Sequence, residues 1–210
     1  MKSPTTFLQK LRSNISQAKT LVRGVPPHGS VSNLHHLKVQ AYIVLTHAAL
    51  ESYFEELGRG AAMKARELFK KNGVITHSLV SLIAAKTLSE ISEKSKRKVS
   101  ESLVSNLALF SKESCNEYVR VLNQNNGIKI QNLKDILIPV GVDPEEIDLV
   151  TTNSLNAFGV SRGEIAHSFV AIRSEHTVSS VNSALSEIMK GIESFDQAVC
   201  SALANSMKKP

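Results

Sequence analysis

Apolar positions recur every three or four residues over most of the chain, which is the spacing of one face of an α-helix. In the N-terminal segment this pattern predicts a helix that ends before residues 24–30, where GVPPHGS interrupts it. The periodic positions there are Phe7, Leu8, Leu11, Ile15, Ala18, Leu21 and Val22. The chain is therefore expected to open with an amphipathic helix.

The same period predicts a long second helix over residues 34–71, closed by the stop signal at Gly73. Residues 78–110 read as one or two further helices interrupted around residues 92–102, SEKSKRKVSES, and residues 111–124 read as another. A short helix is expected from Asn132 to just before Pro139. A last amphipathic helix is expected to begin at Thr177.

Two helix starts stand out between these segments. Asp143 and Pro144 supply an N-cap and a proline at the first helical position, for a helix predicted to end near Gly159. After it, Ser161 and Glu164 fit a capping box, which would make Arg162 the first residue of a new helix.

Within that helix His167 follows Arg162 by five residues, so the two are separated by roughly 140° around the axis. A helix N-terminus with an arginine favours a phosphate group, and a histidine exchanges protons near neutral pH. RNA cleavage needs a base, an acid and a cation for the developing charge, and a symmetric dimer would supply two copies of each residue. The alternative is a capping box whose arginine and histidine are only solvated or packed.

Composition agrees with a helical protein of one domain. Apolar residues make up 42% of the 210 residues and aromatics 5%, with no tryptophan, which favours a core of Leu, Ile, Val and Ala. The net charge of +6 indicates a weak attraction for polyanions, or simply solvated basic faces. Cys115 and Cys200 suggest neither a disulfide framework nor a zinc site, and no apolar run reaches eighteen residues, so we expect a cytoplasmic protein without a membrane span.

Further candidates surround the Arg162–His167 pair in the sequence. Glu51 and His47, one turn apart on the second helix, are candidates for orienting site side chains, or are a solvated or core-capping pair. The basic residues expected to track an RNA backbone, unless they are solvated turns, are Lys94, Lys96, Arg97 and Lys98, with Arg173 and His176 beyond the motif. No H-E-x-x-H spacing accompanies the histidines, so neither a metal site nor a cofactor is expected.

The stretch SRGEIAH, residues 161–167, resembles the R-x4-6-H motif of the HEPN superfamily. The surrounding chain resembles the subgroup found beside RiboL-PSP-type and other prokaryotic defence or toxin–antitoxin genes. Residues 41–60 resemble its second helix with the ALE signature, residues 139–150 its approach helix, and residues 181–199 its closing helix. The resemblance covers about two thirds of the chain, and residues 78–126 match least.

The resemblance implies an all-α, HEPN-like bundle over residues 1–210, with a long second helix, a variable helical insertion at about 74–130, and a homodimer. In active members it implies a metal-independent endoribonuclease whose composite site uses Arg162 and His167 of both subunits, in a toxin or antiviral-defence effector. Its partners would be RNA and an antitoxin or another defence-system protein. Gly163 stands where the family often has Asn, Asp or His, which motivates a second hypothesis, a non-catalytic module that binds nucleic acid or a partner protein.

Overall fold

A computed structural model describes residues 1–29, 32–89, 101, 106–167 and 176–206 of the chain. Within these residues every extended regular element is a helix, and one isolated β-bridge joins Thr76 to Ser206. The predicted all-α class is therefore confirmed. The α-helices are α1 (Thr6–Lys19), α2 (Asn33–Asn72), α3 (His77–Ser89), α5 (Leu107–Gln124), α6 (Ile130–Leu137), α7 (Pro144–Ile147), α8 (Leu149–His167) and α9 (Val178–Ala204), and two 3-10 turns are η1 (Thr20–Val22) and η2 (Ile138–Val140).

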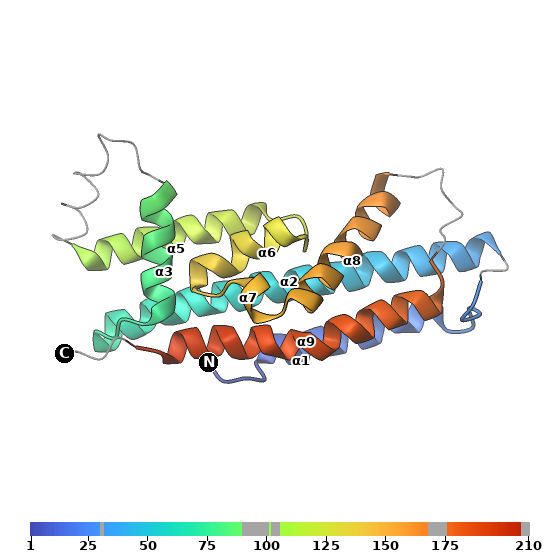
Figure 1. Ribbon diagram of the computed structural model, residues 1–210, viewed down its shortest axis with the longest axis horizontal. Coiled ribbons are helices and arrows are strands. Elements are labelled where there is room, and N and C mark those ends of the chain that lie inside the picture. Colours follow the sequence, from blue (N-terminus) through green and yellow to red (C-terminus); the bar gives the residue numbers. More distant parts are fainter. Residues whose placement is uncertain (30–31, 90–100, 102–105, 168–175, 207–210) are drawn as a thin grey trace.

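The long helix α2 organises the fold (Figure 1). Helix α9 lies along much of α2, the shorter α1 lies against part of it, and α3, α5 and α6 gather around its C-terminal half. Helix α8 packs on both α2 and α9 and crosses them obliquely, with its C-terminal end projecting from the bundle. The fold thus places the last turns of α8 away from the α3–α5 end of the molecule.

Local signals account for the ends of several helices. The Ser32 side chain accepts a hydrogen bond from the His35 amide at the start of α2, and Gly73 ends this helix in the left-handed region at φ 66°. Thr177 begins α9 with a capping box shared with Ser180. The predicted first, second and last helices are therefore confirmed.

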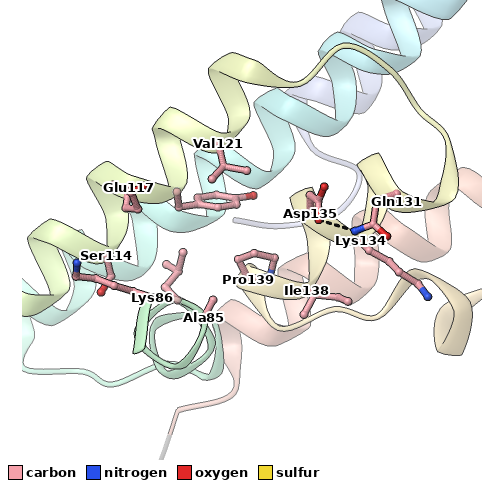
Figure 2. Close-up of a pocket in the computed structure, with 12 residues that line it drawn as sticks. Ala85, Lys86, Ser114, Glu117, Val121, Gln131, Lys134, Asp135, Ile138 and Pro139 are labelled. Carbon is pink, nitrogen blue, oxygen red and sulfur yellow. Dashed lines mark hydrogen bonds between the residues drawn. The ribbon is translucent and has the colours of Figure 1, made fainter. Parts of the chain in front are cut away.

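At the C-terminal half of α2, helices α3, α5 and α6 with η2 enclose a cavity of about 380 Å³ (Figure 2). Tyr118 of α5 lines it and donates a hydrogen bond of 2.5 Å to the carbonyl oxygen of Ile136. Gly58 of α2 makes this packing possible, because a Cβ there would lie 2.2 Å from the Tyr118 hydroxyl.

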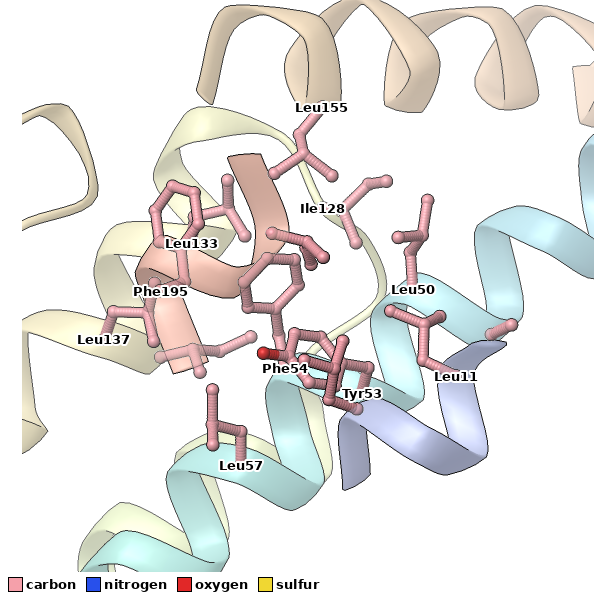
Figure 3. Close-up of a cluster of buried hydrophobic side chains, with 14 of the residues drawn as sticks. Leu11, Leu50, Tyr53, Phe54, Leu57, Ile128, Leu133, Leu137, Leu155 and Phe195 are labelled. Atoms are coloured by element: carbon pink, nitrogen blue, oxygen red, sulfur yellow. The ribbon is translucent and has the colours of Figure 1, made fainter. Parts of the chain in front are cut away.

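The hydrophobic core lies where α2 meets its neighbours (Figure 3). Phe54 of α2 is fully buried and packs edge-to-face on Tyr53 and on Phe195 of α9, with ring centroids 5.0 and 5.9 Å apart. Other core side chains come from α2 itself, from α1, α6 and α8, and from the segment before α6: Leu11, Leu50, Leu57, Ile128, Leu133, Leu137 and Leu155. Both cysteines are buried and unpaired.

One predicted helix start in the middle of the chain is displaced. Helix α5 begins at Leu107 rather than Ser111, because the Asn106 side chain caps the Leu109 amide and Ser111 donates to the Ala108 carbonyl inside the helix. Most of the interruption expected at 92–102 lies outside the described residues, and the assignment of 74–130 as an insertion stays a prediction.

The helix predicted to run from Asp143 to Gly159 begins where expected, but the prediction is wrong in its continuity and at its C-terminal end. Asp143 caps only the single turn of α7, after which Asp148 accepts hydrogen bonds from the amide and hydroxyl of Thr151 and begins α8. Helix α8 then continues through Gly159 to His167. Gly159 is buried against residues 128–129, where a Cβ would lie 3.2 Å from Cγ of Lys129, so this glycine allows close packing and does not end the helix.

Candidate functional site

The Arg162–His167 motif lies in the C-terminal part of α8 and not at a helix start. The hydroxyl of Ser161 donates to the carbonyl oxygen of Ala157 at 3.2 Å, a bond within one continuous helix. Glu164 is exposed on the same helix. The predicted capping box of Ser161 and Glu164 is therefore wrong, because the chain before Ser161 is already helical.

This placement also removes the predicted anion site. Only the first turn of a helix has free amides, and the amides around Arg162 belong to the helix interior. Any attraction of this region for phosphate must come from side chains. Arg162 itself is partly buried, and Ile165 beside it packs against the core.

Helix α2 presents a histidine and a carboxylate to the motif arginine. The Nδ1 atom of His47 and the Oε2 atom of Glu51 are 3.5 Å apart, one turn from each other on α2. Only 2% of the His47 surface is exposed, and burial, with the positive charge of Arg162, lowers the pKa of His47 to about 4. At neutral pH the imidazole is uncharged.

Opposing effects act on the pKa of Glu51. Burial and the neighbouring carboxylate of Glu55 raise the pKa of Glu51, while the guanidinium of Arg162 lowers it. Arg162 therefore acts electrostatically on both α2 residues. The structure brings together Arg162, His47 and Glu51, which the sequence had associated across more than a hundred residues.

Other predicted site residues are placed only in part. His167 is the last residue of α8 in the described part of the chain, and its side chain lies outside the description. Five residues along one helix separate it from Arg162 by roughly 140°. The basic residues Lys94, Lys96, Arg97, Lys98 and Arg173 also lie outside the described residues.

A cavity that the sequence did not predict lies beside the motif. It has a volume of about 340 Å³, lies between α2, α8 and α9, and includes Ser161, the neighbour of Arg162, in its wall. His176, predicted to extend a positive rim beyond the motif, lines it as well. No local pattern marks this cavity, because its lining comes from three separate helices.

Within the described residues no three His, Cys, Asp or Glu side chains are grouped so that they could hold a metal ion. The described helices also include none that is both long and apolar enough to cross a membrane.

A family model described as RiboL-PSP-HEPN matches residues 7–201. The chain belongs to the RiboL-PSP-HEPN family. The predicted resemblance is confirmed, and the match includes residues 78–126, where the motifs were weakest. No curated protein and no solved structure matches the chain.

Proposed function

We propose that this RiboL-PSP-HEPN protein is a metal-independent endoribonuclease that cleaves RNA by attack of a ribose 2′-hydroxyl. The observation that carries the proposal is the electrostatic cluster that Arg162 forms with His47 and Glu51 of α2. Arg162 lies on the same helix, α8, as His167. Family membership supports a nuclease or a module related to nucleic acid. The net charge of +6 agrees with a polyanionic ligand.

In this proposal His167 takes the proton from the 2′-hydroxyl, and the 2′-oxygen then attacks the adjacent phosphorus. Arg162 stabilises the negative charge that develops on the phosphorane oxygens. The bond from phosphorus to the 5′-oxygen breaks, and a second histidine donates a proton to that oxygen. The products are a 2′,3′-cyclic phosphate and a free 5′-hydroxyl, and no oxidant or metal takes part.

The second histidine would come from a second copy of the chain. Arg162 and His167 are separated by roughly 140° around α8, so one copy does not present both on one face. The surface of α8 also carries large apolar side chains that a partner would cover: Leu149 is 53% exposed, Val150 62% and Val160 40%. A homodimer with a composite site is part of the proposal.

His47 and Glu51 hold Arg162 in place. A neutral imidazole does not repel the guanidinium, and the partly buried carboxylate attracts it. His47 and Glu51 would therefore help Arg162 to contact the phosphorane oxygens in the transition state, without touching RNA themselves. At the level of the cell, we propose a toxin or antiviral-defence effector, restrained by an antitoxin or another defence-system protein.

The alternative function is a non-catalytic module that binds nucleic acid or a partner protein through the same surface. Gly163 favours it, because a polar side chain that often follows the arginine in this family is absent here. Among the described residues, and apart from the backbone of α8 and the adjacent residues, no atom lies within 4 Å of a Cβ built at Gly163.

The test compares purified wild-type protein with Arg162→Ala and His167→Ala on total RNA, in the presence of EDTA. Losing one donor to the developing charge typically costs about 10²- to 10³-fold in rate, and losing acid–base help about 10²- to 10⁴-fold. We expect wild type to cleave in EDTA and both variants to be nearly inactive with unchanged melting temperatures.

Arg120→Ala and His28→Ala are matched controls, because both residues are exposed outside α8. They should cleave like wild type. Wild-type protein that binds RNA and leaves it intact would favour the non-catalytic module, and activity that disappears in EDTA and returns with magnesium would contradict the mechanism.

A further inference from the structure

The cavity beside the motif has the composition of a binding site. Its inner wall is apolar and comes from three helices, with Ile43 of α2, Phe158 of α8 and Val181 of α9 all buried. Its volume of about 340 Å³ falls at the lower end of the range of roughly 300–1,000 Å³ typical of small-molecule sites. One planar group of a ligand would fit such a space.

The polar groups around this cavity present mainly acceptors. The hydroxyls of Ser154 and Ser161 donate to the carbonyl oxygens four residues earlier in α8, at 3.0 and 3.2 Å. Ser180 uses its proton in the same way, on the carbonyl of Thr177 at 2.9 Å. A serine hydroxyl that donates to its own chain keeps lone pairs for a ligand, although Ser180 already accepts one bond from the Thr177 amide at 3.0 Å. The exposed carboxylate of Glu187 accepts a bond of 3.0 Å from Lys190 at Oε2, and its Oε1 atom adds a further acceptor to the cavity wall. His176 is the remaining polar side chain of the lining.

An apolar wall with acceptors at its edge matches a nucleobase that carries an amino group. Bases in single strands turn out of the stack, pack their faces on aromatic or apolar side chains, and use their edges for hydrogen bonds. Adenine, cytosine and guanine each offer an exocyclic amino group to acceptors, whereas uracil offers only a ring N–H. The position also fits, because Ser161 in the cavity wall is adjacent to Arg162.

We infer that this cavity is a subsite for one base of single-stranded RNA that carries an amino group, adenine, cytosine or guanine, which sets the backbone of the same strand beside Arg162. The inference rests on the proposed function for the choice of RNA as ligand. It adds what the motif does not provide, a preference for the base next to the cleaved bond.

The experiment fills the cavity from its outer wall. Ala157 lines the cavity and is exposed on α8, so Ala157→Leu adds volume there at little cost to the helix. Ala84→Leu is the matched control, since Ala84 is also exposed and lies on α3, at the other end of the molecule. A second filling variant, Ser154→Leu, blocks the same wall one turn earlier in case Ala157→Leu melts at a lower temperature.

Binding is measured by fluorescence anisotropy with 2′-O-methyl hexanucleotides of adenine, cytosine or uracil, which lack the attacking hydroxyl. We expect wild type and Ala84→Leu to bind the adenine and cytosine hexamers several-fold more tightly than uracil. Both filling variants should lose about 5- to 100-fold in affinity for adenine and cytosine, the usual effect of losing one stacked base. In these variants the difference in affinity between adenine or cytosine and uracil should also disappear.

Equal affinity of wild type and both filling variants would overturn the subsite, as would wild type that shows no preference over uracil or no binding. Cleavage of unmodified RNA in parallel separates the two proposals. RNA that is bound with the expected preference and left intact contradicts the nuclease and leaves the subsite in place. RNA that is cleaved equally at every base by wild type and the filling variants contradicts the subsite alone.

Discussion

Helix α2 takes part in two polar clusters that differ in the interactions that join their members. In the first, the carboxylate of Asp196 is fully buried and accepts bonds of 3.0 and 2.5 Å from the amide and hydroxyl of Thr5, and one of 3.3 Å from the Tyr53 hydroxyl. In the second, His47 and Glu51 approach to 3.5 Å, beyond a good hydrogen bond, with Arg162 nearby.

The difference indicates two roles for buried polarity. A fully satisfied network fixes one packing, and Asp196 thereby joins the cap of α1 to α9 across the whole chain length. Burial and the Asp196 charge also raise the pKa of Tyr53, which keeps this hydroxyl protonated as a donor. The second cluster places the guanidinium of Arg162 near an uncharged imidazole and a carboxylate, and a positive charge of this kind is what a site for a phosphate group needs.

The largest effect on stability is expected where the first cluster is broken. Asp196→Asn replaces one acceptor oxygen by an amino group that faces the donors of Thr5 and Tyr53. Breaking a buried charged network in this way typically costs about 3–5 kcal/mol. Urea unfolding should show this loss, whereas Asp135→Asn, at an exposed position on α6, should change stability by less than about 0.5 kcal/mol.

If Asp196→Asn were as stable as wild type, the Asp196 network would not contribute to the free energy of unfolding. The first cluster would then have no structural role that distinguishes it from the second.

The second cluster should make the stability of the protein depend on pH. The pKa of His47 is lowered in the folded protein to about 4, against 6.5 for an ordinary histidine, so below pH 6.5 the unfolded chain binds a proton that the folded protein does not. Wild type should therefore lose stability between about pH 6.5 and pH 4. The limit is about 3 kcal/mol, from a shift of roughly 2.5 units at 1.36 kcal/mol each.

His47→Gln removes the titrating group and keeps a polar side chain, so the difference between the two proteins isolates His47. Thermal unfolding from pH 7 to pH 4 should show the wild type falling more steeply than His47→Gln. Parallel curves would mean that His47 is protonated in the folded state and that its burial beside Arg162 is not maintained in solution.

The sequence predicted the elements whose ends depend on neighbouring residues. Gly73 and Thr177 end and begin helices through their own backbone and side-chain bonds, and both predictions were right. Gly159 and Ser161 carry the same local signals and misled the prediction, because the role of Gly159 is contact with residues 128–129, which only the folded chain brings there. The signals for helix ends lie in adjacent residues, whereas the close packing of a glycine depends on tertiary contacts that are not visible in the local sequence.

The candidate site divides in the same way. Its motif residues and the α2 pair were found from the resemblance and from residue type, and the structure places Arg162 within electrostatic reach of both His47 and Glu51. The cavity beside them was not found, because Ile43, Phe158 and Val181 have the same periodic spacing as any core residue. Only the crossing of α8 over α2 and α9 leaves space between them.

The smallest expected effect tests whether Ser161 is a cap or an interior residue, and therefore how the motif is built. Inside α8 its hydroxyl bonds to the Ala157 carbonyl, so Ser161→Ala removes a side chain that competes with the helix and should raise stability by up to about 0.5 kcal/mol. At a helix start the same change would lower stability by about 1 kcal/mol. Thr177→Ala is the matched comparison, because Thr177 is a true N-cap and should show that loss. If urea unfolding gave Ser161→Ala the same loss as Thr177→Ala, α8 would begin at Ser161 in solution, and Arg162 would stand at a helix N-terminus with free amides around it.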